Sequence, residues 1–518
     1  MIKMVSNGVN MHGKKLINNS IISVGYKITI LLLGLITRKI FLIYIGEELL
    51  GLNSLYANLL DLLNLADLGI GVAVQFQLYE PLVKQDYTKL SKIMGAAKKI
   101  YNTIGTLILI LGIVLAFFIQ HLIRSTTYPL WYVRVSFLIS VSGVAFGYFF
   151  VHKRLFLQAN EELGLVNILD LLAKIITVIL SLISTVLFRN YFIYLLLNAA
   201  YGGLSNLIIH FIFKKRYPLI LTDTQQCSNE VGRLLGNLKN VVPMKLSNYV
   251  YNSTDNVVVS KVLGLTTVAL YSNYMTIING IMGIEYLIGN AVTSSIGKII
   301  AKRQNTDTVY QIYLTFQYIQ FLFTSFCTVS LAMLSKPFIS LWIGEQFLIE
   351  DVCFALLVVD FFIHSMYQPA YVMYGATGKF QDDKYITIAS AVMNIAVSVA
   401  LVGAIGLPGV ILGTLITDIY IWAVRSYQMV KGYWNENLCV YVIKMILYSA
   451  LTAAGLIISL KIGTFVFVDS FFLELIIKAA ICCIVPNLIN ILATFKSREL
   501  KSIIKSASNY IHRGKTRK

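Results

Sequence analysis

Apolar stretches of about 20 residues recur along the whole chain of 518 residues, and each is long enough to cross a bilayer as an α-helix. Membrane-spanning strands would need short alternating segments, which the sequence lacks. Hydrophobic residues make up 57% of the chain and charged residues only 13%, too few to cover a water-soluble protein of this length. The sequence therefore predicts an all-α polytopic membrane protein.

About fourteen segments are predicted to span the membrane as helices. They are residues 16–36, 50–78, 100–123, 130–151, 163–187, 192–213, 239–262, 266–296, 312–334, 351–376, 386–405, 407–428, 441–463 and 471–493. With the N-terminus inside, the connections, the tails and the adjoining helix ends carry 31 Lys and Arg on the inner side and 7 on the outer side, and 5 more lie well within helices. This asymmetry predicts a multi-pass protein of the cytoplasmic membrane with both termini in the cytoplasm. The net charge of +18 then reflects topology and not nucleic-acid binding.

An internal repeat constrains the arrangement of these helices. A gap-free shift of 218 residues aligns residues 16–84 with residues 234–302 and gives 13 identities. Lys27 falls on Lys245, and Asp67 falls on Glu285, which keeps the acid. The repeat predicts two parallel six-helix lobes, related by an axis along the membrane normal, that expose a central cavity by alternating access.

The repeat divides the chain into five parts. They are an N-lobe (residues 1–213, helices 1–6), a cytoplasmic connection (214–238), a C-lobe (239–428, helices 7–12), two further helices (429–493) and a basic cytoplasmic tail (494–518).

Catalytic and cofactor motifs are absent from the sequence. It has no Walker sequence, no G-x-S-x-G and no H-E-x-x-H, its six histidines are dispersed, and its six cysteines show no metal-ligand spacing. We therefore expect neither an enzyme nor a bound metal or cofactor.

Lysines within the predicted helices are the first candidates for a binding site, because an intramembrane charge costs at least about 2.5 kcal/mol. Lys27 lies eleven residues beyond Leu16, roughly 16 Å along its helix. Its repeat partner Lys245 shares a helical face with three polar residues, Asn248, Asn252 and Asp255. Together the two lysines suggest a cationic cavity suited to a pyrophosphate. In the alternative interpretation, a nearby acid neutralises each lysine and the pair is structural.

Other charges in the first lobe allow two interpretations. Asp170 and Lys174 are four residues apart on one helix, so they can form an ion pair, although Lys174 could also contact substrate. Arg134 lies near the outer end of its helix and could contact substrate or simply reach the interface.

Acidic side chains in the helices are candidates for binding a coupling ion. A carboxylate in a cavity of low dielectric is suited to a proton relay. The candidates are Asp67, Asp255, Glu285, Asp170, Asp418, and Asp360 with His364 on the same face of one helix. Helix-to-helix hydrogen bonding is the alternative for each of them.

Several motifs resemble the Wzx-type oligosaccharide flippases, the polysaccharide-transporter branch of the multidrug/oligosaccharidyl-lipid/polysaccharide (MOP) flippase superfamily. They include Gly51-Leu-Asn-Ser-Leu, Leu65-Ala-Asp-Leu-Gly-Ile-Gly, Leu78-Tyr-Glu-Pro-Leu, Ser253-Thr-Asp-Asn, Leu270-Tyr-Ser-Asn-Tyr, Pro337-Phe-Ile-Ser-Leu-Trp-Ile-Gly and Gly378-Lys-Phe-Gln-Asp-Asp-Lys-Tyr. The resemblance spans roughly residues 15 to 435 as a set of motifs. By position, Lys27, Asp67, Asp255 and Lys384 match the family pattern. The arginine expected between Gln368 and Gly378 is missing, which puts the tenth helix's part in substrate binding in doubt.

The resemblance implies a flippase that moves undecaprenyl-pyrophosphate-linked oligosaccharide units for surface polysaccharide assembly, with assembly proteins as possible partners. Two alternatives within the superfamily are a multidrug antiporter and a lipid II flippase. A membrane polysaccharide polymerase is the alternative from a different class, but the large outer loop it would need is missing. The identity of the sugars, the coupling ion and the oligomeric state do not follow from the sequence.

Overall fold

The computed structural model is helical in all the regular elements it describes. It describes residues 22, 25–63, 70–220, 232, 241–301, 306–377, 380–466 and 470–504. Ten helices in this part of the chain are long and apolar enough to cross a membrane. The predicted fold class, an all-α polytopic membrane protein, is confirmed.

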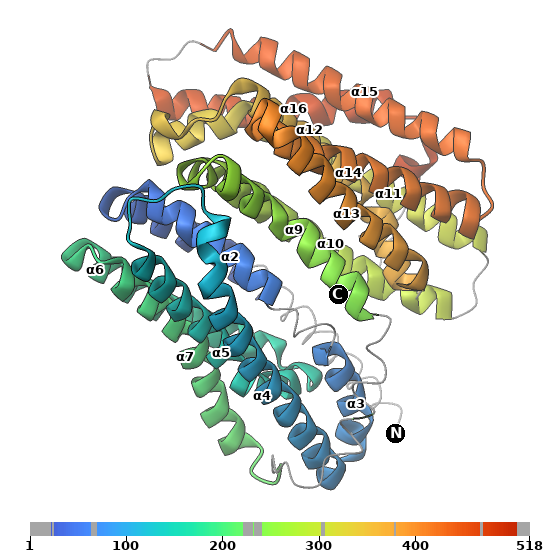
Figure 1. Cartoon of the computed structure of the whole chain (residues 1–518). Coiled ribbons are helices and arrows are strands. Elements are labelled where there is room, and N and C mark those ends of the chain that lie inside the picture. The colour runs from blue at the N-terminus through green and yellow to red at the C-terminus, as the bar shows by residue number, and fades with distance from the viewer. Residues whose placement is uncertain are drawn as a thin grey trace. The chain divides into compact units, whose positions relative to one another are not determined.

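The chain forms two compact units, residues 1–272 and residues 273–518. The helices of the first unit, labelled in Figure 1, follow a helical stretch at residues 25–44. They are α2 (Glu47–Leu63), α3 (Ile70–Lys84), α4 (Tyr87–Phe118), the short η2 (Ile119–Leu122), α5 (Leu130–Ala159), α6 (Leu163–Phe188), α7 (Tyr191–Arg216), α9 (Val241–Val262) and the start of α10 (Leu265–Ala301).

The second unit takes the rest of α10 and all later helices. They are α11 (Thr306–Trp342), η3 (Glu345–Phe347), α12 (Asp351–Thr377), α13 (Phe380–Ile405), α14 (Leu407–Tyr427), the π-helical turn η4 (Gln428–Tyr433), α15 (Leu438–Gly463) and α16 (Phe471–Ala493). The boundary between the two units along the chain falls within α10, between Ser272 and Asn273. The lobe division derived from the repeat therefore stays a prediction.

Many predicted helices are found within a few residues of their expected ends, and several differ more. Helix α4 begins at Tyr87, well before the predicted start at residue 100, and α11 ends at Trp342, beyond the predicted end at residue 334. The first helical stretch continues to residue 44, beyond the predicted end at residue 36. The single helix predicted at 50–78 is described as α2 and α3, with residues 64–69 outside the described part. Helix α5 continues eight residues past its predicted end, to Ala159. Each extension brings charged residues into a helix that was expected to stop before them.

Small residues allow the helices of the first unit to pack closely. Helices α4, α5 and α7 lie side by side (Figure 1). A Cβ atom added to Gly112 of α4 would lie 2.4 Å from the Val141 side chain of α5. A Cβ atom added to Gly143 of α5 would lie 2.6 Å from Ala199 of α7. Close backbone approach at small residues is how membrane helices gain packing energy, since apolar burial alone gains little in lipid.

Aromatic stacking and small residues hold the second unit together. Phe321 of α11 stacks on Tyr448 of α15 with the ring centroids 4.1 Å apart. Tyr313 of α11 stacks on Trp434, which follows the π-helical turn, at 4.8 Å. Helices α13 and α14 meet closely at Gly409, where an added Cβ would lie 2.6 Å from the backbone of Leu401. These contacts fix the helices that carry the polar residues of this unit.

The internal repeat is visible in the backbone of the first unit. Gly46 and Gly264 stand 218 residues apart, and both have positive φ, +104° and +98°. The Gly46 amide donates to the Phe41 carbonyl at 3.2 Å, and the Gly264 amide donates to the Val259 carbonyl at 3.0 Å. Both glycines therefore end a helix in the same way, with a conformation that residues with a Cβ adopt at a cost. This agreement supports the 218-residue register.

Candidate functional site

A buried ion pair ties three helices of the first unit together. Both nitrogens at the end of the Arg154 guanidinium on α5 bind the Asp170 carboxylate on α6, at 2.6 and 2.8 Å. Asp170 is only 4% exposed. A bidentate pair of this kind partly offsets the cost of removing two charges from water.

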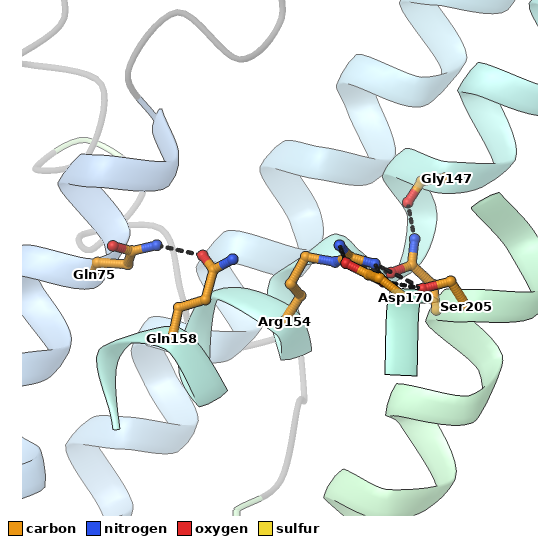
Figure 2. A network of polar contacts seen from close by, with 7 residues as sticks. Gln75, Gly147, Arg154, Gln158, Asp170 and Ser205 are labelled. Atoms are coloured by element: carbon orange, nitrogen blue, oxygen red, sulfur yellow. Dashed lines mark hydrogen bonds and ion pairs between the residues drawn. The ribbon is translucent and has the colours of Figure 1, made fainter. Parts of the chain in front are cut away.

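Helix α7 completes this network, which Figure 2 shows from close by. Ser205 donates to the Asp170 carboxylate and accepts from Arg154 at 2.9 Å. Asn206 accepts from Arg154 at 3.1 Å and donates to the Gly147 carbonyl of α5 at 2.8 Å. Nearby, Gln75 of α3 donates to Gln158 of α5 at 2.7 Å. Both carboxylate oxygens of Asp170 therefore accept hydrogen bonds from side chains inside the protein.

The predicted pair between Asp170 and Lys174 is wrong. Asp170 binds Arg154 instead, and the Lys174 ammonium lies 4.8 Å from the centre of the Tyr201 ring. A guanidinium on a neighbouring helix can engage both carboxylate oxygens at once, which a lysine one turn away on the same helix cannot do. Arg154 was missed because it was counted in a loop. The absence of a helix breaker before Asn160 was the signal that could have placed it in α5.

Lys27 lies on the helical stretch at residues 25–44, near this network. Its neighbour Tyr26 interacts with the Tyr201 hydroxyl and feels the charges of Asp170 and Arg154. The Lys27 side chain is exposed, and it forms no ion pair with any described residue. Tyr201 thus contacts both Tyr26, the neighbour of Lys27, and the Lys174 ammonium, while the role of the two lysines in binding substrate stays a prediction.

Arg134 lies at the opposite end of α5 from Arg154. Twenty residues separate the two, which corresponds to about 30 Å along a helix. The Arg134 guanidinium lies 5.7 Å from the Phe117 ring, and one of its nitrogens is 3.4 Å from the Phe117 carbonyl. The structure does not bring Arg134 together with the network around Asp170.

The polar stripe of α9 is described only in part. Asp255 is buried, and the Tyr271 hydroxyl donates to its carboxylate at 3.0 Å. The side chains of Lys245, Asn248 and Asn252 lie outside the described part of the chain, and so does the whole of Asp67.

Two serines related by the repeat contact each other in the first unit. The Ser54 hydroxyl of α2 donates to the Ser272 hydroxyl of α10 at 3.1 Å, and the two residues are 218 positions apart. Arg38, on the helical stretch at residues 25–44, also donates to Ser272. Both serines are buried.

Glu285 is the centre of a polar group in the second unit. It is 5% exposed and accepts a hydrogen bond from Gln320 of α11 at 3.1 Å. Gln320 also reaches Thr324, one turn further along α11, at 3.3 Å. His364 and Ser365 of α12 lie close enough to interact with the Glu285 carboxylate. Helices α10, α11 and α12 therefore meet at a buried acid.

His364 continues this polar group towards α14. Its Nδ1 lies 2.9 Å from an Asp418 carboxylate oxygen and 2.8 Å from the Tyr367 hydroxyl. Its Nε2 lies 3.2 Å from the amide nitrogen of Gln368. The sequence placed His364 beside Asp360 on one helical face, but the carboxylate that it contacts is that of Asp418. Asp360 lies one turn earlier on α12 and acts electrostatically on Tyr367.

A second buried acid–arginine pair lies between α13 and α14. Arg425 contacts both carboxylate oxygens of Asp383, at 2.8 and 3.2 Å. The guanidinium lies 4.9 Å from the Tyr371 ring of α12. The tenth helix, which lacks the arginine that the family resemblance leads one to expect, therefore packs against an arginine from α14. The neighbouring Lys384 is half-buried, and its ammonium lies 5.8 Å from the Tyr385 ring.

Each unit thus holds a buried aspartate that forms an ion pair with an arginine. Each also holds further polar groups suited to binding an ion or an anionic substrate. Asp170 lies on the fifth predicted helix, and Asp383 lies on α13, three residues before the predicted start of the eleventh helix at residue 386; the fifth and eleventh helices are equivalent in the two-lobe interpretation. Among the described residues, no group of three His, Cys, Asp or Glu side chains could hold a metal ion.

Comparison with known proteins gives a consistent picture of the fold. The MatE family model matches residues 242–400. A lipid II flippase MurJ in an inward closed conformation aligns with a TM-score of 0.66 at 16% identity, covering 93% of this chain and 99% of MurJ. An inward-facing multidrug resistance MATE transporter of the MOP superfamily aligns with a TM-score of 0.61 at 16% identity, covering 78% of this chain and 96% of that one.

A third similar structure is a MOP superfamily transporter from Pyrococcus furiosus. It aligns with a TM-score of 0.54 at 17% identity and covers 82% of this chain and 97% of that transporter. No curated protein matches the chain by sequence. The chain therefore shares the fold of these transporters, and its residues 242–400 match the MatE family.

Proposed function

We propose that this protein is a flippase that moves an undecaprenyl-pyrophosphate-linked oligosaccharide unit from the inner to the outer leaflet of the cytoplasmic membrane. The product would serve the assembly of a surface polysaccharide. Both termini would lie in the cytoplasm, in keeping with the 31 basic residues expected on the inner side.

The extent of the structural likeness supports a lipid-linked substrate. The lipid II flippase covers 93% of this chain, whereas the inward-facing multidrug transporter covers 78%. The larger share favours a fold like that of a lipid flippase. The motifs that resemble Wzx-type flippases then favour an oligosaccharide unit over the peptidoglycan precursor.

The exposed ammonium of Lys27 is the observation that carries the proposal. It lies on the helical stretch at residues 25–44 and has no acidic partner among the described residues. An unpaired cation in a membrane helix is costly, and it is suited to receive a phosphate. The same cation would repel the cationic substrates of a multidrug transporter.

The transport cycle also needs an ion that resets the empty carrier. The polar group of Glu285, His364 and Asp418 is the strongest candidate, since it is buried and joins α10, α12 and α14. Asp67, Asp255 and Asp360 remain candidates for the same role. Asp170 is a weaker one, because its carboxylate already binds Arg154.

A multidrug antiporter is the second candidate function. The match of residues 242–400 to the MatE family and the buried carboxylates of the second unit favour it. Such a transporter would exchange a cationic drug for a proton or another cation, with the acids as its binding groups.

Reconstituted protein distinguishes these functions. In proteoliposomes, a fluorescent undecaprenyl-pyrophosphate glycan should move between leaflets, as measured by its accessibility to a membrane-impermeant quencher. Lys27→Ala should slow this movement about ten-fold or more, since a charge-assisted hydrogen bond is lost. Lys245→Ala should have a similar effect if the repeat-related lysines act together. Lys39→Ala is the matched control, because Lys39 is an exposed lysine of the same helical stretch.

Two outcomes would reject the proposal. The first is a wild-type protein that ignores the glycan lipid and exchanges a cationic drug for protons, which would establish the antiporter. The second is transport of lipid II with no movement of the glycan lipid, which would assign the substrate of the structurally similar flippase.

A further inference from the structure

Five cationic or imidazole side chains gather where α4, α5 and α7 lie side by side. They are Lys98 of α4, His152 and Lys153 of α5, and His210 and Lys214 of α7, called here the basic cluster. The Lys153 ammonium lies 2.6 Å from Nδ1 of His210 and 5.7 Å from the centre of the Phe213 ring. Lys98 and Lys214 are near enough to repel the Lys153 charge.

The basic cluster has no acidic counterpart in the described part of the chain. Two acids at the neighbouring helix α6 already have partners, because Asp170 binds Arg154 and Glu162, which precedes α6, binds Arg216. Lys153 is 7% exposed, and only one of its three N–H groups has a described acceptor. So much unbalanced positive charge at a buried lysine is unfavourable unless an anion joins it.

His152 provides an independent sign of a missing ligand. The side chain is 2% exposed, and neither ring nitrogen has a hydrogen-bond partner among the described residues. A neutral imidazole has one N–H donor, and a buried donor without an acceptor is unfavourable. A phosphate oxygen at the basic cluster would satisfy it.

The position of the basic cluster along the helices indicates the depth at which it lies in the membrane. Lys98 precedes the apolar segment 100–123, His152 and Lys153 follow the segment 130–151, and Lys214 follows the segment 192–213. All of these ends face the predicted cytoplasmic side. The cluster therefore lies at the depth of the lipid head groups of the inner leaflet, where basic side chains attract anionic lipids.

An apolar surface adjoins the cluster on α7. Phe211 and Leu207, one turn apart, are exposed at 68% and 43%, and Lys214 follows on the same helix. A lipid whose phosphate meets Lys214 could lay its acyl chains along these two side chains. A free phosphate ion would make no use of this surface.

We propose that the basic cluster binds the phosphate of an anionic glycerophospholipid from the inner leaflet. Lys98 and Lys214 attract the head group, and Lys153 with His152 donates to the phosphate oxygens. The lipid would hold α4, α5 and α7 together at their inner ends. This site is separate from Lys27 and does not depend on the proposed transport function.

Native mass spectrometry of the full-length protein, delipidated in detergent, tests the proposal. Phosphatidylglycerol should bind more tightly than phosphatidylcholine with the same acyl chains. The double variant Lys98→Gln/Lys214→Gln should weaken phosphatidylglycerol binding by roughly thirty-fold, from the contribution of two lysines near a membrane surface. Lys153→Met, which keeps most of the side-chain volume, should weaken it as well.

The matched control is the double variant Lys92→Gln/Lys215→Gln. It removes the same charge from exposed lysines of the same two helices, outside the cluster. Equal losses in the two double variants would mean that net charge alone attracts the lipid, and the proposed site would be wrong. Binding of inorganic phosphate as tight as that of phosphatidylglycerol would also overturn it, since the ligand would then be a soluble anion.

Discussion

At the scale of single residues, the first unit depends on how a charge is accommodated in an apolar interior. Asp170 has its two carboxylate oxygens bound by one guanidinium and a serine hydroxyl. Arg154 in turn reaches α6 and α7 from α5. Removing one member of such a pair leaves the other buried and uncompensated, which costs more than the pair gains.

Asp170→Asn should therefore destabilise the protein strongly. We expect a loss of about 3–5 kcal/mol, because the Arg154 charge would remain in the interior. Thermal unfolding of the purified protein in detergent measures this loss as a lower Tm. Glu80→Gln is the control, since Glu80 pairs with Lys84 on an exposed surface and should leave the Tm unchanged. A Tm for Asp170→Asn equal to that of the control would show that the pair is not structural.

The same pair shows the limit of reasoning from sequence at this scale. The sequence identified Asp170 as a charge inside a helix, but local spacing pointed to Lys174 as its partner. The true partner is sixteen residues away on another helix. The contact depends on how α5 and α6 pack, and this packing is not encoded in the spacing along one helix. Asp383 and Arg425 are 42 residues apart, and the packing of α13 against α14 likewise brings them together.

At the scale of elements, Glu48 joins the start of α2 to the segment before α5. Its carboxylate accepts hydrogen bonds from the Thr126 hydroxyl at 2.7 Å and from the backbone N–H of Thr127 at 2.8 Å. The Thr127 hydroxyl donates to it at 2.6 Å. Partial burial raises the pKa of the Glu48 carboxyl, but these hydrogen bonds lower it by more, so the pKa lies below its ordinary value.

This contact should weaken in acid. A carboxyl with a depressed pKa stabilises the fold above its ordinary pKa of about 4.3, and this contribution is lost as the pH falls through the lower, folded-state pKa. Hydrogen exchange should be faster at the Thr127 amide in Glu48→Gln than in the wild type near pH 7. The two should become equal below the folded-state pKa. Glu47→Gln, at the exposed neighbouring position, should match the wild type throughout. A difference that persists in acid would contradict this account.

The helices themselves were largely predictable. In a long apolar stretch that crosses lipid, the backbone N–H and C=O groups find their hydrogen-bond partners within a helix. The ends of the helices were less predictable. The prediction stopped α5 at residue 151 because His152, Lys153 and Arg154 follow. In the structure Arg154 binds Asp170 of α6 and Lys153 contacts His210 of α7, and the helix continues to Ala159. Tertiary contacts thus decide whether a charged residue ends a membrane helix.

At the scale of the whole molecule, the orientation in the membrane is the main feature that rests on sequence alone. The excess of Lys and Arg predicts that the connection between α14 and α15 faces the cytoplasm. Cys439 lies at the start of α15 and is exposed, which makes it a natural probe of this connection.

A membrane-impermeant maleimide should label Cys439 in inside-out vesicles and not in intact cells. The test uses the variant Cys227→Ser/Cys483→Ser, which removes one cysteine outside the described residues and one other exposed thiol. Detergent-solubilised protein gives the full extent of labelling. Labelling of Cys439 from outside in intact cells would reverse the predicted topology.

The contact between Ser54 and Ser272 has a consequence for the origin of the chain. When two positions related by a repeat touch each other, the rotation axis that relates the repeats must pass between them. Before the two halves were joined in one gene, a half-length ancestor would have met a second copy of itself at this same serine. In the two-lobe interpretation, this hydrogen bond would therefore lie on the axis between the repeats, as a self-complementary contact does in a symmetric dimer.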